Sequence, residues 1–210
     1  MLNGKARKSR QSSALRLNAN FMINLPKLIL ASGSPRRSEI LKSVGWEFIK
    51  DVPDIDESEH AGESPEIYVQ RLAKTKAQTI AARHTGNIVL GADTTVVIDK
   101  QIIGKPIDLE DAGRMLKMLS GNWHEVLTGV AVVRGDKTQV GLQSTRVKFA
   151  AMSESEIDFL VANGDPLDKA GAYAVQAQAA LFIEGIEGDY WNVVGLPVSL
   201  VYELVNKAEA

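Results

Sequence analysis

Apolar and polar positions follow two patterns from Lys27 to the end of the chain. Short apolar runs with period-two alternation predict strands, whereas apolar residues three and four apart predict helices. The stretch NIVLGADTTVVID is apolar on both alternating faces, which is typical of a central strand. Other strands are predicted at KLILAS, WEFIKDV, the pair HEVLTGVAVVR and TQVGLQSTRVKF around the turn Gly135-Asp136, GAYAVQ, ALFIEGI and WNVVG.

Helices are predicted between these strands and after them. The first begins with Ser34 as N-cap followed by Pro35, and it places Ile40, Leu41 and Val44 on one apolar stripe. The succession of strands and helices predicts an α/β fold with a mixed central sheet. The other helices are predicted at 64–84, at 108–120, at 153–163 with Ser153 and Glu156 as a capping box, and from Pro197 onward.

Composition limits the classes of protein that this chain can represent. Its 210 residues, 45% of them hydrophobic, can bury a sizeable core as one large domain or as two lobes that share a sheet. The net charge of −2 gives no overall basic field, so nucleic acid is not an expected partner. Cysteine is absent, which excludes disulfides, zinc–thiolate sites and a cysteine nucleophile and fits a reducing compartment such as the cytoplasm. No apolar run approaches the roughly 18 residues of a membrane span, so no membrane partner is expected.

The N-terminal stretch differs in composition from the rest. Residues 1–27 carry six basic residues and neither Asp nor Glu. We expect residues 1–26 to form a basic, disordered extension and residues 27–207 to form the folded domain. An upstream start codon ahead of Met22, an organelle transit peptide and a basic arm that contacts an anionic partner are the alternatives for this stretch.

The stretch LILASGSPRRSEIL puts two arginines where a strand leads into a helix. A helix N-terminus presents unpaired N–H groups, and small residues before it let an anion approach the backbone. Arg36 and Arg37 add donors that suit phosphate oxygens. The sequence therefore indicates a phosphate site here, although an ordinary Ser-Pro helix start with a solvated arginine pair would look the same.

Asp93 interrupts the apolar central strand in GADTTV. Burying a carboxylate is costly unless it is paired, hydrogen-bonded or bound to a metal ion. Asp93 is therefore a candidate for binding a hard cation, for activating water, or for both. The alternative is that the strand ends at Asp93 and that the carboxylate caps a turn.

Other charged residues stand alone in small or apolar surroundings. They are Glu57 in DIDES, Lys76 in RLAKTKA, Lys105 in IIGKP, and Asp168-Lys169 in PLDKAGAY. Each alone is more often a surface charge, but together they offer oxygens for a divalent ion and cations for several phosphate charges. The chain has no Walker A loop, Rossmann fingerprint or zincin helix, and its three histidines lack ligand spacing, so Mg²⁺ or Mn²⁺ is the expected metal.

Seven motifs in this order resemble the Maf family of nucleoside triphosphate pyrophosphatases over roughly residues 27–206. The resemblance implies an α/β fold related to the inosine triphosphate pyrophosphatases, with a cleft between two lobes. It also implies hydrolysis of a nucleoside triphosphate to the monophosphate and pyrophosphate with a divalent metal, and a homodimer. The motifs are LASGSPRR, RLAKTKA, LGADTTVV, GKP, LSGNWHEVLTGVA, PLDKAGAYAVQ and VVGLP.

The same resemblance assigns roles to individual residues. Asp93 matches the family's proposed proton acceptor, and Glu57, together with Asp93, matches the acids associated with the metal. The polar and basic set around the phosphates corresponds to Ser34, Arg37, Lys76, Lys105 and Lys169. Phosphoryl transfer depends mainly on positioning and charge neutralisation, which such a set could supply.

Three positions point to the base of the substrate. In the branch that resembles 7-methyl-GTP pyrophosphatases, Trp, Gln and Glu stand where this chain has Arg36, Thr94 and Gln176. A Trp face attracts a cationic methylated guanine, whereas Arg36 would repel it, and the Gln176 amide can pair with thymine or uracil. We therefore expect dTTP and UTP as substrates. A 7-methyl-GTP pyrophosphatase, or a nucleotide-binding regulator of cell division with little turnover, is the alternative.

Overall fold

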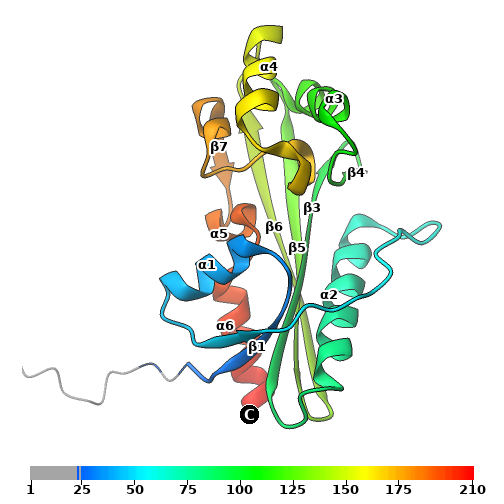
Figure 1. The fold of residues 1–210 in the computed structure, drawn as a ribbon, viewed down its shortest axis with the longest axis vertical. Helices are drawn as coiled ribbons and strands as arrows, with labels where there is room; N and C mark the ends of the chain where they lie inside the picture. Colours follow the sequence, from blue (N-terminus) through cyan, green and yellow to red (C-terminus); the bar gives the residue numbers. More distant parts are fainter. Residues whose placement is uncertain (1–22, 24) are drawn as a thin grey trace, which may run out of the picture.

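The computed structural model describes residue 23 and residues 25–210 and shows a mixed sheet with helices on both faces (Figure 1). The predicted α/β fold is therefore confirmed. The strands are β1 (Leu28–Ala31), β2 (Phe48–Lys50), β3 (Ile88–Ile98), β4 (Gln101–Ile103), β5 (Trp123–Arg134), β6 (Lys137–Phe149) and β7 (Ile183–Glu187). The helices are α1 (Pro35–Ser43), α2 (Pro65–Ala81), α3 (Leu109–Leu119), α4 (Glu154–Asn163), α5 (Tyr190–Val194) and α6 (Val198–Glu209).

The sheet combines a parallel part with an antiparallel part. The strand order is β2-β1-β3-β5-β6-β7, and β4 pairs with β3 outside this row. Strand β1 runs parallel to β2 and β3, whereas β3, β5, β6 and β7 follow one another in antiparallel pairs. Strand β3 lies between β1 and β5, so the predicted central strand is confirmed.

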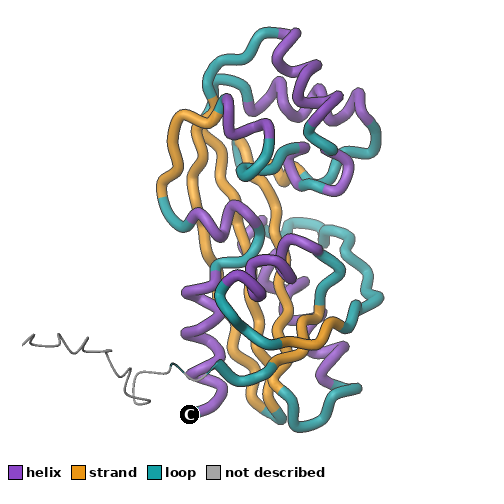
Figure 2. Tube along the Cα trace, turned by 60° about the vertical axis from the view of Figure 1, so that its left-hand side comes forward, coloured by secondary structure: helices purple, strands orange, loops and turns teal. Residues whose placement is uncertain are grey.

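Helices cover the two faces of the sheet unequally. Helix α2 packs on one face of β3 and β5, whereas α6 packs on β5 and β6 from the opposite side (Figure 1). Figure 2 shows the long strands running from these helices to a second group at the other end, which includes α3 and α4. The long antiparallel strands thus join two lobes.

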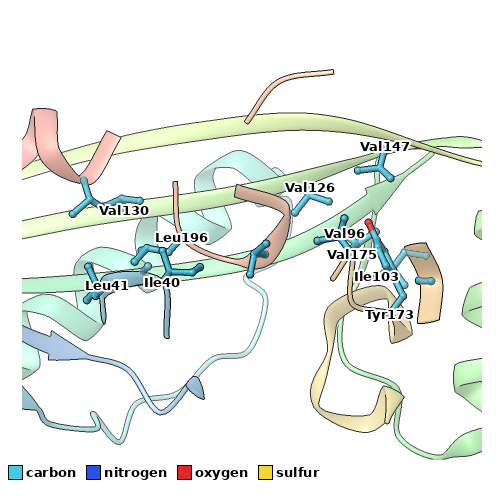
Figure 3. Close-up of a cluster of buried hydrophobic side chains, with 14 of the residues drawn as sticks. Ile40, Leu41, Val96, Ile103, Val126, Val130, Val147, Tyr173, Val175 and Leu196 are labelled. Atoms are coloured by element: carbon cyan, nitrogen blue, oxygen red, sulfur yellow. The ribbon is translucent and has the colours of Figure 1, made fainter. Parts of the chain in front are cut away.

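One hydrophobic cluster extends along the sheet from lobe to lobe. Figure 3 shows Ile40, Leu41 and Leu196 at one end of this cluster and Val96 and Tyr173 at the other. All five side chains are buried, with exposed fractions of 8% or less. The two lobes therefore share one hydrophobic core.

Several predicted elements differ in the structure. GAYAVQ is not a strand, because Gly171 and Ala172 adopt left-handed φ angles of 68° and 62° that interrupt an extended chain. WNVVG is the short helix α5, because the Asp189 carboxylate accepts hydrogen bonds from the backbone N–H groups of Trp191 and Asn192 and so starts a helical turn.

Smaller corrections concern the ends of elements. Val44 is 39% exposed and lies beyond the end of α1, so it does not belong to the predicted apolar stripe. The predicted extension, residues 1–26, falls almost entirely outside the described residues. At its end, the Pro26 carbonyl accepts a hydrogen bond of 2.8 Å from Trp46 Nε1. Within the described part of the chain, no helix is long and apolar enough to cross a membrane.

Candidate active site

A cleft of about 550 Å³ lies between the start of α1, the middle of β3 and the segment from Asp168 to Gln176. Five basic and four acidic side chains line it, so its walls carry many charges but little net charge. All ten of the residues predicted from the sequence lie along this one cleft. They are Ser34, Arg36, Arg37, Glu57, Lys76, Asp93, Thr94, Lys105, Lys169 and Gln176.

Asp93 lies at the middle of the eleven-residue strand β3, opposite Gly129 of β5. The alternative that the strand ends at Asp93 is therefore wrong. Its side chain is buried, and Lys76 Nζ donates a hydrogen bond of 2.6 Å to its Oδ1. Burial raises the pKa of Asp93, while the nearby charges of Lys76 and Arg37 oppose that shift. A carboxylate with a raised pKa is a suitable acceptor for the proton of an attacking water.

Two glycines allow α2 to bring Lys76 to Asp93. A Cβ atom on Gly91 would overlap the backbone of α2 at Ala73, and a Cβ atom on Gly129 would overlap it at Val69. The helix backbone therefore rests directly on strands β3 and β5. Because Lys76 lies one helical turn after Ala73, its side chain enters the cleft beside Asp93.

Glu57 reaches the same lysine from the loop before α2. Its Oε1 lies 2.8 Å from Lys76 Nζ, so Lys76 holds the carboxylates of Glu57 and Asp93 on either side. The loop is fixed to α2 by Tyr68, whose hydroxyl donates to the Glu57 carbonyl at 3.0 Å. Arg71 forms a two-pronged ion pair with Glu63 and also donates to the Ser58 carbonyl at 2.9 Å.

Tyr68 and Arg71 were not among the predicted site residues. Their spacing places them on one face of the helix, and the Arg71 guanidinium lies 5.5 Å from the centre of the Tyr68 ring. The sequence pattern that could have indicated them is an arginine on one helix face directly after an acidic loop. These two residues fix the loop that carries Glu57 through its backbone carbonyls.

Arg37 is buried and bonds mainly to the protein. Its guanidinium donates to the carbonyls of Ala92 and Gly195, at 2.8 and 2.9 Å. It also donates to Ser32 Oγ and Thr94 Oγ1, each at 3.1 Å. Because a guanidinium has five N–H donors, these four hydrogen bonds leave one for a ligand. Arg37 thus fixes the strand on either side of Asp93 more than it presents a free cation.

The other predicted cations differ in how strongly the protein already binds them. Arg36 and Lys169 both contact Asp168, and Lys169 also contacts Asp165. Lys105 is exposed on the cleft wall and, among the described residues, has no ion-pair partner within 4.0 Å. Lys105 can therefore bind an incoming anion without displacing a carboxylate.

The remaining predicted residues are polar and uncharged. Ser34 occupies the N-cap position of α1, but its hydroxyl makes no capping bond, and its backbone N–H donates to Ser32 Oγ at 3.2 Å. Thr94 Oγ1 lies 2.9 Å from Thr128 Oγ1, so it is held within the protein. Gln176 is exposed and lines the cleft, which leaves its amide available to a ligand.

Two carboxylates of the cleft, those of Glu57 and Asp93, are the candidate ligands for a metal ion. The described residues include no group of three or more His, Asp or Glu side chains placed to hold an ion. However, Glu57 and Asp93 approach the same point, where Lys76 Nζ now lies between them. Mg²⁺ commonly binds through one or two carboxylates plus substrate phosphates, so this pair fits such an ion.

Comparisons with known proteins agree with one another. The sequence model of a family described as "Maf-like protein" matches residues 27–208. A dTTP/UTP pyrophosphatase of Symbiobacterium thermophilum is 49% identical over 183 residues, which is 87% of this chain and 94% of that protein. A dTTP/UTP pyrophosphatase of Myxococcus xanthus is 47% identical over 181 residues, covering 86% of this chain and 92% of that protein.

Solved structures are similar at the level of the fold. A HAM1 protein from Coxiella burnetii has a TM-score of 0.50 at 16% identity and covers 88% of this chain and 100% of its own. The Staphylococcus aureus Ham1 protein also has a TM-score of 0.50, at 15% identity, and covers 86% of this chain and 98% of its own. At such low identity, the similarity shows a shared α/β architecture.

Proposed function

This chain belongs to the family of Maf-like proteins, and on that basis we propose that it hydrolyses dTTP and UTP to the nucleoside monophosphate and pyrophosphate. Its curated relatives bear the name dTTP/UTP pyrophosphatase and align over most of both chains. The observation that carries the proposal is the buried Asp93, held by Lys76 in a cleft lined by five basic side chains.

Asp93 is proposed as the proton acceptor for the attacking water. As the water oxygen bonds to the α-phosphorus, its proton passes to the Asp93 carboxylate and the bond from the α-phosphorus to the bridging oxygen breaks. Pyrophosphate leaves with the electrons of that bond. Supporting this role, burial raises the pKa of Asp93, which strengthens it as a base.

Lysine and arginine side chains are proposed to neutralise the phosphate oxygens. Lys105 can bind a phosphate without losing a partner, whereas Arg36 and Lys169 would exchange the Asp168 carboxylate for a phosphate. Lys76 lies beside the proposed base, where it can orient the carboxylate and approach the α-phosphate. Most of the rate acceleration would come from such positioning and charge neutralisation.

A divalent cation, Mg²⁺ or Mn²⁺, is proposed as the cofactor, with Glu57 and Asp93 as its protein ligands. When bound, it would supply positive charge to the phosphate oxygens. Tyr68 and Arg71 support this role, since they fix the loop that carries Glu57. A homodimer and a cytoplasmic location stay predictions from the sequence.

The preference for pyrimidines rests on Arg36, Thr94 and Gln176 jointly and on the names of the relatives. The Gln176 amide can offer a donor and an acceptor side by side, which matches the N3–H and a carbonyl of thymine or uracil. Guanine also presents an N–H beside a carbonyl, so Gln176 alone does not exclude it. Cytosine reverses this pattern, with an unprotonated N3 and an amine, so CTP should be a poor substrate where the bound Gln176 amide keeps the orientation that suits thymine and uracil. Asp168 is paired with Arg36, which reduces the repulsion that Arg36 would exert on a cationic base.

A turnover panel with Mg²⁺ tests the proposed function. The substrates are dTTP, UTP, CTP, ATP, GTP and 7-methyl-GTP, and the assay measures pyrophosphate and orthophosphate separately. We expect pyrophosphate as the product and the highest kcat/KM for dTTP and UTP. A highest kcat/KM for 7-methyl-GTP would contradict the pyrimidine preference, and absence of pyrophosphate release from every substrate would contradict the enzyme assignment.

A further inference from the structure

An ion pair crosses the cleft between the start of α1 and the 3₁₀ turn η2 (Pro166–Asp168). Arg36 Nη1 lies 3.1 Å from Asp168 Oδ2, and Arg36 Nη2 donates to the Asp168 carbonyl at 3.2 Å. The two residues are 132 positions apart in the sequence. Helix α1 belongs to one lobe, whereas η2 packs against α3 in the other. The contact therefore connects the two walls of the cleft.

Asp168 binds a second cation with its other oxygen. Lys169 Nζ donates to Asp168 Oδ1 at 2.5 Å, so each carboxylate oxygen of Asp168 is held by a different cation. Although burial raises the pKa of Asp168, the Lys169 and Arg36 cations more than offset that effect and lower it. Asp168 is thus a carboxylate anion, and it takes up the two cations as a phosphate group would.

A carboxylate in this place conflicts with tight binding of a polyanion. The proposed function needs Arg36 and Lys169 to contact phosphate oxygens, and both now contact Asp168. An incoming ligand must displace the carboxylate, and its negative charges then lie close to it. A ligand phosphate and the Asp168 carboxylate therefore compete for the same two cations.

We propose that Asp168 competes with ligand phosphates for Arg36 and Lys169. The inference rests on the proposed function, because it concerns the phosphates of that substrate. Asp168 weakens the binding of phosphorylated ligands, and it takes the two cations back after hydrolysis, which favours release of the products. It does not take part in the attack on the α-phosphorus.

The test compares Asp168→Asn with the control Asp165→Asn. Asn keeps the shape of Asp168 and the backbone contact to Arg36 but removes the charge. Asp165 also contacts Lys169, but it makes no contact with Arg36. Its φ of 47° is a left-handed conformation that Asn tolerates. The measurements are KM and kcat for dTTP and the inhibition constants of dTDP and pyrophosphate, with thermal unfolding as the check on folding.

We expect Asp168→Asn to lower KM for dTTP and both inhibition constants by at least about threefold, in line with the loss of two partly exposed ion pairs. Asp165→Asn should change them by less than about twofold. A constant KM in Asp168→Asn would overturn the proposal, because it would show that Asp168 does not compete with substrate. A KM that rises would also overturn it, because it would show that Asp168 holds the two cations in place for substrate. If Asp168→Asn unfolds at a lower temperature than the wild type, the same constants are measured for Asp168→Ala, with the same expected decrease. Failure of the proposed function would show differently, as no pyrophosphate release by the wild type.

Discussion

Lys76 on α2 donates a hydrogen bond of 2.6 Å to Asp93 at the middle of β3, and both side chains are buried. The charge of Lys76 opposes the rise that burial causes in the pKa of Asp93. This relationship sets the pH range in which Asp93 is ionised and can accept a proton. It also makes the activity of the enzyme sensitive to a charge on a neighbouring helix.

The pH profile of kcat/KM should reflect this pair. Because the pKa of Asp93 is raised above the ordinary value of 3.8, activity should fall at a pH above 3.8 as the solution is acidified. Lys76→Met removes the opposing charge, so the acidic limb should move to still higher pH. The control is Lys74→Met, an exposed position on the same helix, which should leave the limb unchanged. An acidic limb that stays in place in Lys76→Met would contradict the pairing.

The close approach of α2 to the sheet can be tested at Gly129. Gly129→Ala places a Cβ atom against the α2 backbone at Val69, so we expect destabilisation by about 1–3 kcal/mol, as is usual for overpacking. The displaced helix should also lower kcat, because Lys76 moves away from Asp93. Gly113→Ala, on α3 with ordinary space around it, is the matched control and should be neutral or slightly stabilising. Denaturant unfolding and dTTP turnover measure the two effects, and a fully active Gly129→Ala would argue against this packing.

The sequence predicted more of the site than of its surroundings. Asp93 and the cations are visible in sequence as an acid in a central strand and as isolated charges in small-residue motifs. Only the resemblance to the Maf family predicted the uncharged site residues Ser34, Thr94 and Gln176. All of these residues lie along one cleft. The hydrogen-bond and ion-pair partners of these residues cannot be predicted from local sequence. Arg36 and Asp168 meet only because α1 and η2 face each other across the cleft, and nothing local in either segment indicates the pairing.

Two predicted strands are absent from the structure for a similar reason. GAYAVQ and WNVVG have strand-like composition, but two left-handed residues redirect the first and the Asp189 cap turns the second into a helix. Strand β4 was not predicted; it forms because Asp99 and Lys100, with left-handed φ angles of 50° and 65°, turn the chain back onto β3. In these short segments a cap or a turn outweighs residue propensity.

His124 provides a prediction about stability. It is 2% exposed, and its Nε2 lies 2.7 Å from the hydroxyl of Tyr173. Burial lowers the pKa of His124 from 6.5 to about 4. As the pH falls from 6.5 to about 4, the unfolded chain takes up a proton that the folded chain does not, so the folded state loses stability.

The loss of stability caused by His124 at acidic pH can be measured by comparing the wild type with a variant. Between pH 7 and pH 4 the wild type should lose about 3 kcal/mol of unfolding free energy more than His124→Gln, which cannot be protonated there. Urea unfolding at several pH values gives the comparison, and equal pH dependence in the wild type and His124→Gln would contradict the prediction.

Asp93→Asn, measured by the rate of pyrophosphate release from dTTP with Mg²⁺, tests the proposed catalytic role most directly. The variant should fold, because the raised pKa means that the buried charge reduces stability at neutral pH. Asp99→Asn, in the exposed turn after β3, is the control and should keep full activity. We expect kcat of Asp93→Asn to fall by at least about 100-fold, as is typical when a general base is lost. If the folded variant kept more than about a tenth of the wild-type kcat, Asp93 would not be the base.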